Sequence, residues 1–236
     1  MPRNAFFFLP FLLFVFLVFF LLLVFLFALI QVGAITVAFT KLGLTTQQVF
    51  WILMGTLLGS MVNIPLYRRQ AAGSGRSIEL KPSGLWGHYR LPRQGALSLS
   101  GEQTISVNVG GGLIPCLLSL FFLSQIGLSG GLILCLLIVS LASYKLARPI
   151  AGVGIGIPFL LPPLLAVLCT WLLAPAEQAP QIAYICGSLG TLIGADILHL
   201  LNKRTLAELR APLLSIGGAG TFDGIFLSGI LAVLLT

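Results

Sequence analysis

The chain has 236 residues, of which 58% are hydrophobic and 8% are charged, and its formal net charge is +7. Because soluble domains are about 25% charged, this composition excludes an ordinary soluble protein and predicts an integral membrane protein. A membrane helix takes about 20 apolar residues, so the length allows roughly six to eight spans and excludes a separate soluble domain.

Seven apolar windows follow one another along the chain. They cover residues 5–31, 48–67, 105–124, 127–144, 149–173, 182–201 and 211–235. The expected fold is therefore all-α: a polytopic bundle of about seven transmembrane helices that forms a single integral membrane domain over residues 1–236. The first window holds ten of the 17 phenylalanines and is interpreted as an N-terminal anchor helix.

The basic residues predict the orientation, because Lys and Arg accumulate on the cytoplasmic side of an inner (plasma) membrane. With a cytoplasmic N-terminus, twelve of the 13 fall on that side and only Lys41 falls outside. Residues 68–104 then form a basic cytoplasmic loop that is suited to anionic lipids. Within and just beyond it, "LSLSGEQTISVNV" is typical of a short interfacial hairpin. The charge needs no nucleic-acid partner.

Three of the windows contain glycine-rich stretches, two of them with a proline, that predict an interruption of the helix. They read "NVGGGLIP", "AGVGIGIP" and "SIGGAGTFDG", and they include Gly110, Gly154 and Gly220. All three helices run outward from the cytoplasm, so we expect their irregular parts at one depth. A bilayer tolerates such backbone only where it is buried in protein or lines a wet cavity. The alternative is close helix packing through small residues four apart, as at Gly190 and Gly194.

Two carboxylates fall inside predicted spans, Asp196 and Asp223, and these spans are consecutive. Carboxylates a few Å apart cannot both ionise easily, so such a pair can share a proton. His199 follows Asp196 by three positions and lies on the same helical face, which makes it a candidate relay. An interfacial position for this histidine is the alternative.

Three further polar residues stand near the cytoplasmic ends of their predicted spans: Asn63, Asn108 and Arg148. We include them in a candidate ion or substrate pathway. Each also has a structural interpretation, because asparagines form hydrogen bonds between membrane helices and Arg148 can be a topology charge at a helix start.

The aspartate pair suits several functions. In an ion- or proton-coupled carrier, our leading hypothesis, the pair exchanges protons or binds a small cation. In an intramembrane aspartyl peptidase, one carboxylate activates water and the other protonates the leaving group. In a non-catalytic assembly factor, the aspartates only hold helices together.

No cofactor or metal is expected from the sequence motifs. Asp196, His199 and Asp223 could share an ion, but the chain has no H-E-x-x-H motif. "GGAGTFD" lacks the Lys and Ser/Thr of a phosphate-binding loop, and haem motifs are absent.

Three motifs, "VNVGGGLIP", "GTLIGADILHL" and "IGGAGTFDGIFLSG", resemble a multi-pass membrane family known as domain of unknown function 1614. The resemblance covers roughly residues 48–236 and implies a membrane protein without a known activity. A looser resemblance, carried by Asp196 and the glycine-rich segment around Asp223, is to presenilin-like and prepilin-peptidase-like aspartyl proteases. The chain has Phe222 where those families have a glycine, and Ala195 where the presenilin-like group has a tyrosine.

Overall fold

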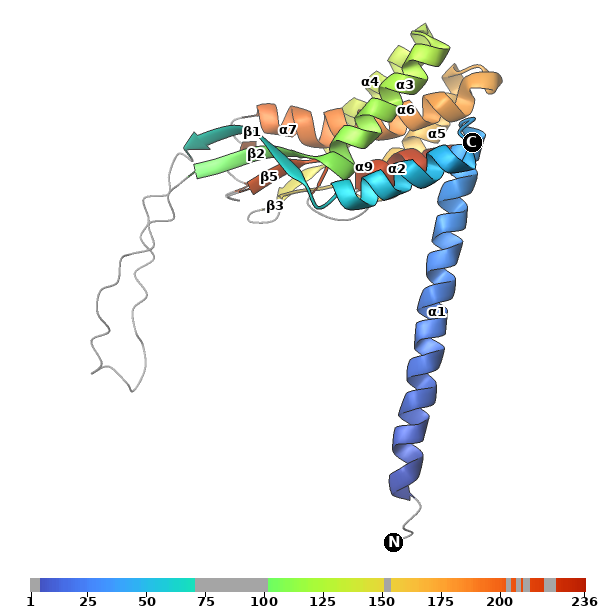
Figure 1. Cartoon of the computed structure of the whole chain (residues 1–236). Helices are drawn as coiled ribbons and strands as arrows, with labels where there is room; N and C mark the ends of the chain where they lie inside the picture. Colours follow the sequence, from blue (N-terminus) through green and yellow to red (C-terminus); the bar gives the residue numbers. More distant parts are fainter. Residues whose placement is uncertain are drawn as a thin grey trace, which may run out of the picture.

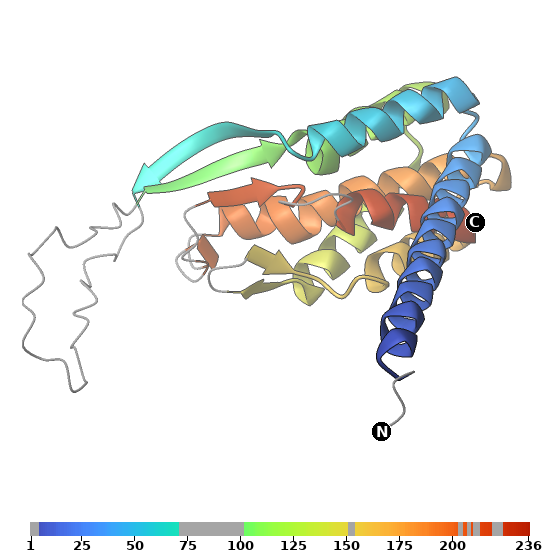
Figure 2. The same ribbon diagram turned by 60° about the horizontal axis from the view of Figure 1, so that its bottom comes forward.

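The computed structural model describes residues 5–70, 102–150, 154–202, 205–206, 209, 213–218 and 224–236. This part of the chain is mostly helical, and its strands gather at one end of the helices (Figure 1). The C-terminus lies at the opposite end in both ribbon views (Figure 2). The helices therefore form a layer with a strand end and a C-terminal end.

Most predicted windows contain a helix, with ends that differ from the prediction. The helices are α1 (Ala5–Lys41), α2 (Thr46–Gly59), α3 (Ile114–Ile126), α4 (Gly130–Leu146), α5 (Leu161–Leu173), α6 (Ala179–Thr191), α7 (Leu198–Leu201) and α9 (Gly224–Leu235). The π-helical turn η1 (Val109–Leu113) leads into α3, the 3-10 turn η2 (Ala176–Gln178) leads into α6, and the π-helical η3 (Leu192–Ile197) joins α6 to α7.

Three of these helical stretches are long and apolar enough to cross a membrane: Phe16–Lys41, Val109–Ile126 and Ala176–Leu201. Shorter apolar helices cover Gly130–Leu146, Leu161–Leu173 and Gly224–Leu235. The structure is thus compatible with a membrane protein, whereas the seven-span topology and the cytoplasmic N-terminus stay predictions.

Strands replace helix in parts of four of the predicted windows, which corrects a purely helical fold. β1 (Asn63–Gln70), β2 (Glu102–Asn108) and β5 (Leu213–Ile216) form one sheet in the order β1-β2-β5. β1 is antiparallel to β2, and β2 is parallel to β5. β3 (Arg148–Ile150) and β4 (Gly154–Gly156) form a separate antiparallel pair. Short apolar runs do not distinguish a buried strand from a helix end, so hydropathy alone assigned these residues to spans.

The predicted interfacial hairpin is wrong in its pairing. Its second arm is the strand β2, but β2 pairs with β1, where Asn63 stands opposite Asn108. The first arm lies outside the described residues. Much of the predicted 68–104 loop is also outside them, since the described part contains only the end of β1 and the start of β2.

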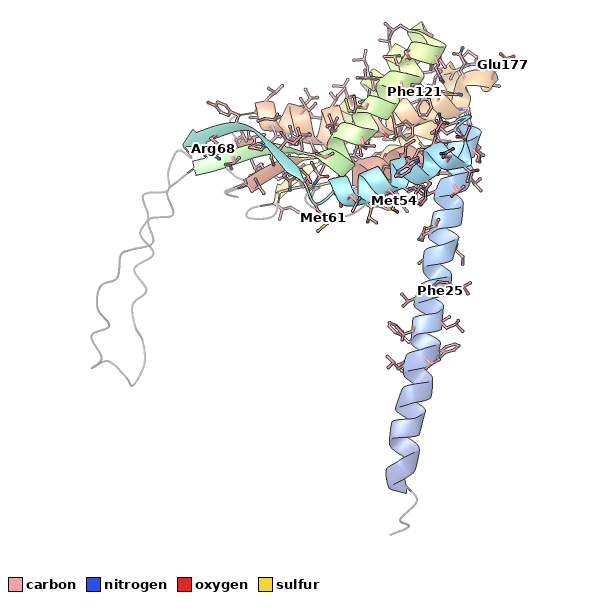
Figure 3. The ribbon with its side chains drawn as sticks, viewed as in Figure 1. Phe25, Met54, Met61, Arg68, Phe121 and Glu177 are labelled. Carbon is pink, nitrogen blue, oxygen red and sulfur yellow. The ribbon has the colours of Figure 1, made fainter. Side chains whose placement is uncertain are left out.

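The helix α1, which corresponds to the predicted anchor, extends beyond the predicted window to Lys41 and leaves the other helices near the C-terminus (Figure 1). Its last turns are packed into the core: the Phe39 ring centroid lies 6.2 Å from that of Phe226 in α9. The Lys41 ammonium donates a hydrogen bond of 3.3 Å to the Leu234 carbonyl, at the end of α9. The C-terminal turns of α1 therefore hold it to the bundle, while the side chain of Phe25 projects from its free part (Figure 3).

The helix α6 is the centre of the bundle. Residues Ile182–Ser188 are all buried, and glycines allow neighbouring helices to approach closely. At Gly190 a Cβ would lie 2.7 Å from the Val139 side chain of α4, and at Gly187 it would lie 3.0 Å from the Ser228 carbonyl of α9. Large apolar side chains cover the outside of the bundle, including Phe121, which is 43% exposed (Figure 3). Lipid can solvate such a surface, whereas water cannot do so favourably.

Replacing Gly194 by alanine should destabilise the bundle. The new Cβ would meet the Ser140 carbonyl oxygen and would lie 2.7 Å from the Ser143 Cβ of α4. Overpacking of this kind costs about 1–3 kcal/mol, so we expect a lower melting temperature in detergent. Gly33→Ala is the control, because a Cβ there has no neighbour within 4 Å. Equal melting of the two variants would contradict the close contact between α4 and η3.

Candidate functional site

A cavity of about 190 Å³ lies at the strand end of the bundle, between η3, β4, β5 and the first turn of α9. Most of its wall is apolar, and its polar side chains are Asp196, Thr191 and Ser215. A water molecule occupies about 30 Å³ in the liquid, so the cavity has room for several waters or for a hydrated ion.

Asp196 belongs to the π-helical η3, a type of turn that is often found at functional sites. Its side-chain oxygen Oδ2 accepts a hydrogen bond of 2.7 Å from the Gly217 amide. A hydrogen bond to an ionised carboxylate is stronger than one between neutral groups. Gly217 and Gly218 have φ angles of +83° and +75°, a backbone conformation that favours glycine. The glycines after β5 therefore form the turn that presents this amide to the carboxylate.

The three glycine-rich stretches meet around this turn. The backbones of Gly112 and Gly217 are in contact, and a Cβ at Gly112 would lie 2.9 Å from the Ile216 carbonyl oxygen. Gly110, on the other side of η1, packs against the Thr56 carbonyl and the Ser60 amide of α2. Gly154 lies in the wall of the cavity with a φ of +140°. The stretch that contains Gly112 thus packs against the Gly217 turn. The stretch that contains Gly154 lines the cavity.

Asn63 and Asn108 come together in one hydrogen-bonded network beneath the same turn. Asn108 is fully buried. Its side-chain oxygen Oδ1 accepts from the Gly111 backbone amide at 2.7 Å, and its side-chain nitrogen Nδ2 donates to the Ser60 backbone carbonyl at 2.7 Å. That nitrogen also donates to Asn63 Oδ1 at 3.3 Å, which accepts from the Ser215 hydroxyl at 2.7 Å. The network joins α2, η1 and the three-stranded sheet, so both asparagines position the backbone next to the cavity.

His199 is buried against α4. Its Nδ1 lies 3.2 Å from the Gly194 carbonyl oxygen, and its ring centroid is 4.5 Å from that of Tyr144. It is absent from the described residues that line the cavity. Arg148 is exposed at the start of β3, opposite Gly156, and begins a strand where a helix start was expected.

Asp223 and Gly220 lie outside the described residues, so the separation of the two aspartates stays a prediction. The described residues on either side of that segment, Gly218 and Gly224, both line the cavity. Among the residues that the structure describes, no three His, Cys, Asp or Glu side chains lie close enough to hold a metal ion.

Thr191, Ser215 and Gly217 are parts of the site that the sequence pattern did not predict. Thr191 and Asp196 are five positions apart, which puts them on different faces of an α-helix. In the π-helical η3 the hydrogen bonds run from i to i+5, so both residues face the cavity. The signal for Ser215 and Gly217 was present in "SIGGAG", but the contact with Asp196 is not visible in a linear sequence.

Removing the Asn108 side chain should disrupt the hydrogen-bonded network that joins α2, η1 and the sheet next to the cavity. Asn108→Ala leaves the Gly111 amide and the Ser60 carbonyl without these partners in a buried position. Each unsatisfied buried group costs about 1–3 kcal/mol, so the melting temperature in detergent should fall clearly. Gln47→Ala removes an exposed amide from the first turn of α2 and should change little. A fully stable Asn108→Ala variant would show that the network is not structural.

Comparison with known proteins places the chain in a family. A search of curated proteins and a search of solved structures each found no match. These comparisons therefore do not show the resemblance to aspartyl proteases. A family model described as "Protein of unknown function (DUF1614)" matches residues 57–235, which include β1 and β2, η3, the β5 turn and α9. The chain belongs to the DUF1614 family of proteins of unknown function.

Proposed function

We propose that this protein is an ion- or proton-coupled, carrier-like membrane protein in which Asp196 binds a proton or a small cation. The observation that carries the proposal is the Asp196 carboxylate in the wall of a mostly apolar cavity at the strand end of the bundle. An ionisable group at membrane depth is costly, and such groups usually mark ion or proton pathways.

The size of the cavity favours a small ligand. Pockets for drug-sized molecules measure about 300–1,000 Å³, whereas this cavity measures about 190 Å³. A hydrated cation or a few waters fit, but an extended peptide does not fit unless the helices separate. The volume therefore favours ion or proton binding over an intramembrane aspartyl peptidase.

In this proposal Asp223 is the second carboxylate. It directly precedes Gly224, which lines the cavity, and sharing a proton between two carboxylates would let the site load and release a charge. We also propose that the strand end faces the cytoplasm, as the distribution of basic residues predicts. His199 then acts by positioning η3 through the Gly194 carbonyl.

A closed core favours a second candidate, a non-catalytic assembly factor. Between the cavity and the C-terminal end, the bundle is filled by the buried rings of Phe39, Phe122, Tyr184 and Phe226. The Phe122 and Tyr184 centroids are 5.5 Å apart. A carrier must separate these rings in another conformation, whereas an assembly factor keeps them together.

Asp196→Asn should abolish ion or proton movement without unfolding the protein. The amide keeps the shape of the carboxylate and can still accept from the Gly217 amide, but it carries no charge and does not titrate. We expect loss of flux in liposomes that contain a pH-sensitive dye, under an imposed potential and with sodium, potassium or no added cation outside. Glu177→Gln is the control, because Glu177 is exposed in η2, far from the strand end (Figure 3).

The same measurement separates the two candidates. A parent protein that moves neither protons nor cations, combined with a lower melting temperature for Asp196→Asn, would reject the carrier and favour the assembly factor. Flux that survives Asp196→Asn would remove Asp196 from the pathway.

A further inference from the structure

Four buried hydroxyl groups lie along the interface between α6 and α9. Tyr184, Ser188 and Thr191 follow one another on one face of α6, and Ser228 faces them from α9. Each of the four residues is at most 1% exposed. Thr191 also lines the cavity at Asp196, so the row begins at the candidate site and runs into the centre of the bundle.

The outer pair of the row is hydrogen-bonded. The Thr191 hydroxyl donates to the Gly187 carbonyl at 2.6 Å, and it lies 3.3 Å from the Ser228 hydroxyl. A hydroxyl has one proton to donate, so Ser228 is the donor in this second bond. Thr191 thus accepts a hydrogen bond from within the row. To take up a proton from Ser228 it must release its own, which requires its hydroxyl to rotate from the Gly187 carbonyl toward the cavity.

The inner pair consists of the Tyr184 and Ser188 hydroxyls, which are fully buried and interact with each other. Neither hydroxyl makes a hydrogen bond of ordinary geometry among the described residues. The Ser188 oxygen occupies the place where a Cβ of residue 229 would stand, and the Tyr184 ring lies 3.1 Å from the same point. Gly229 therefore makes room for both groups. Buried hydroxyls without a protein partner are usually satisfied by ordered water.

We propose that Thr191, Ser228, Ser188 and Tyr184, with water bound between them, form a proton relay that extends the Asp196 cavity into the bundle. Thr191 and Tyr184 are seven positions apart, so the relay reaches roughly 10 Å along α6. It ends at Tyr184, whose ring centroid is 5.5 Å from that of Phe122 and 6.5 Å from that of Phe39. These apolar rings stop the protons at the middle of the bundle until the helices move.

The relay rests on the proposed function of Asp196, but its hydration can be measured independently. Hydroxyl-radical footprinting of the full chain in nanodiscs, in ¹⁸O-labelled water, oxidises side chains next to bound water even when they are buried. We expect Tyr184 to be labelled severalfold faster than Phe226, although both are fully buried. Exposed Tyr67 is the positive control. Equal protection of Tyr184 and Phe226 would overturn the hydrated row, whatever Asp196 does.

Proton flux tests the relay itself. Tyr184→Phe and Ser188→Ala remove one hydroxyl each with little change in shape, and we expect each to slow proton uptake into liposomes severalfold without a lower melting temperature. Ser119→Ala is the matched control, because Ser119 is equally buried but donates to the Pro115 carbonyl in α3. Flux that falls in Asp196→Asn but not in the two relay variants would overturn the relay and leave the Asp196 site standing. Flux that is unchanged in Asp196→Asn would overturn the proposed function, while the footprinting still decides whether the row holds water.

Discussion

The contact between the backbones of Gly112 and Gly217 is the constraint on which the rest of the site depends. Residues with a side chain cannot bring η1 and the turn after β5 this close together. The positive φ of Gly217 directs its amide to Asp196, and Asn108 fixes η1 by capping Gly111. Segments that are 105 positions apart in the sequence thus form one continuous wall next to the carboxylate. The described glycines of the first and third stretches therefore make a backbone contact that is closer than ordinary helix packing.

The helix α6 connects this wall to the rest of the molecule. Its glycines admit α4 and α9 to close range, and its hydroxyl groups face α9 in a row that starts at the cavity. The π-helical η3 then changes the register of the helix, so that Asp196 shares the cavity with Thr191. Small residues thus serve two purposes at once: they tighten the packing between helices, and they leave room for polar groups that a membrane interior would otherwise exclude.

The closed aromatic centre limits what the observed conformation can do. Phe39 joins this cluster from the last turns of α1, so the Phe-rich helix, which the sequence predicts to be an anchor, is also a part of the core. Any passage from the cavity to the C-terminal end requires Phe39, Phe122 and Tyr184 to separate. A movement of α1 relative to α6 and α9 would be the simplest way to achieve this, because α1 contributes only its last turns to the bundle.

The sequence by itself predicted a membrane protein, with which the apolar helices of the structure are compatible. It also identified Asp196, Asn63 and Asn108 as candidate site residues, because composition and hydropathy depend on residue type alone. The family also followed from contiguous motifs, and its model matches residues 57–235. Tertiary structure decided that Asn63 pairs with Asn108 in a sheet, and that most of the rest of "NVGGGLIP" forms a π-helical turn. It also decided that Thr191, Ser215 and Gly217 lie around Asp196. The physical reason is that strand pairing, π-helical register and contact between distant glycines are fixed by partners far away in the chain, which no local pattern encodes.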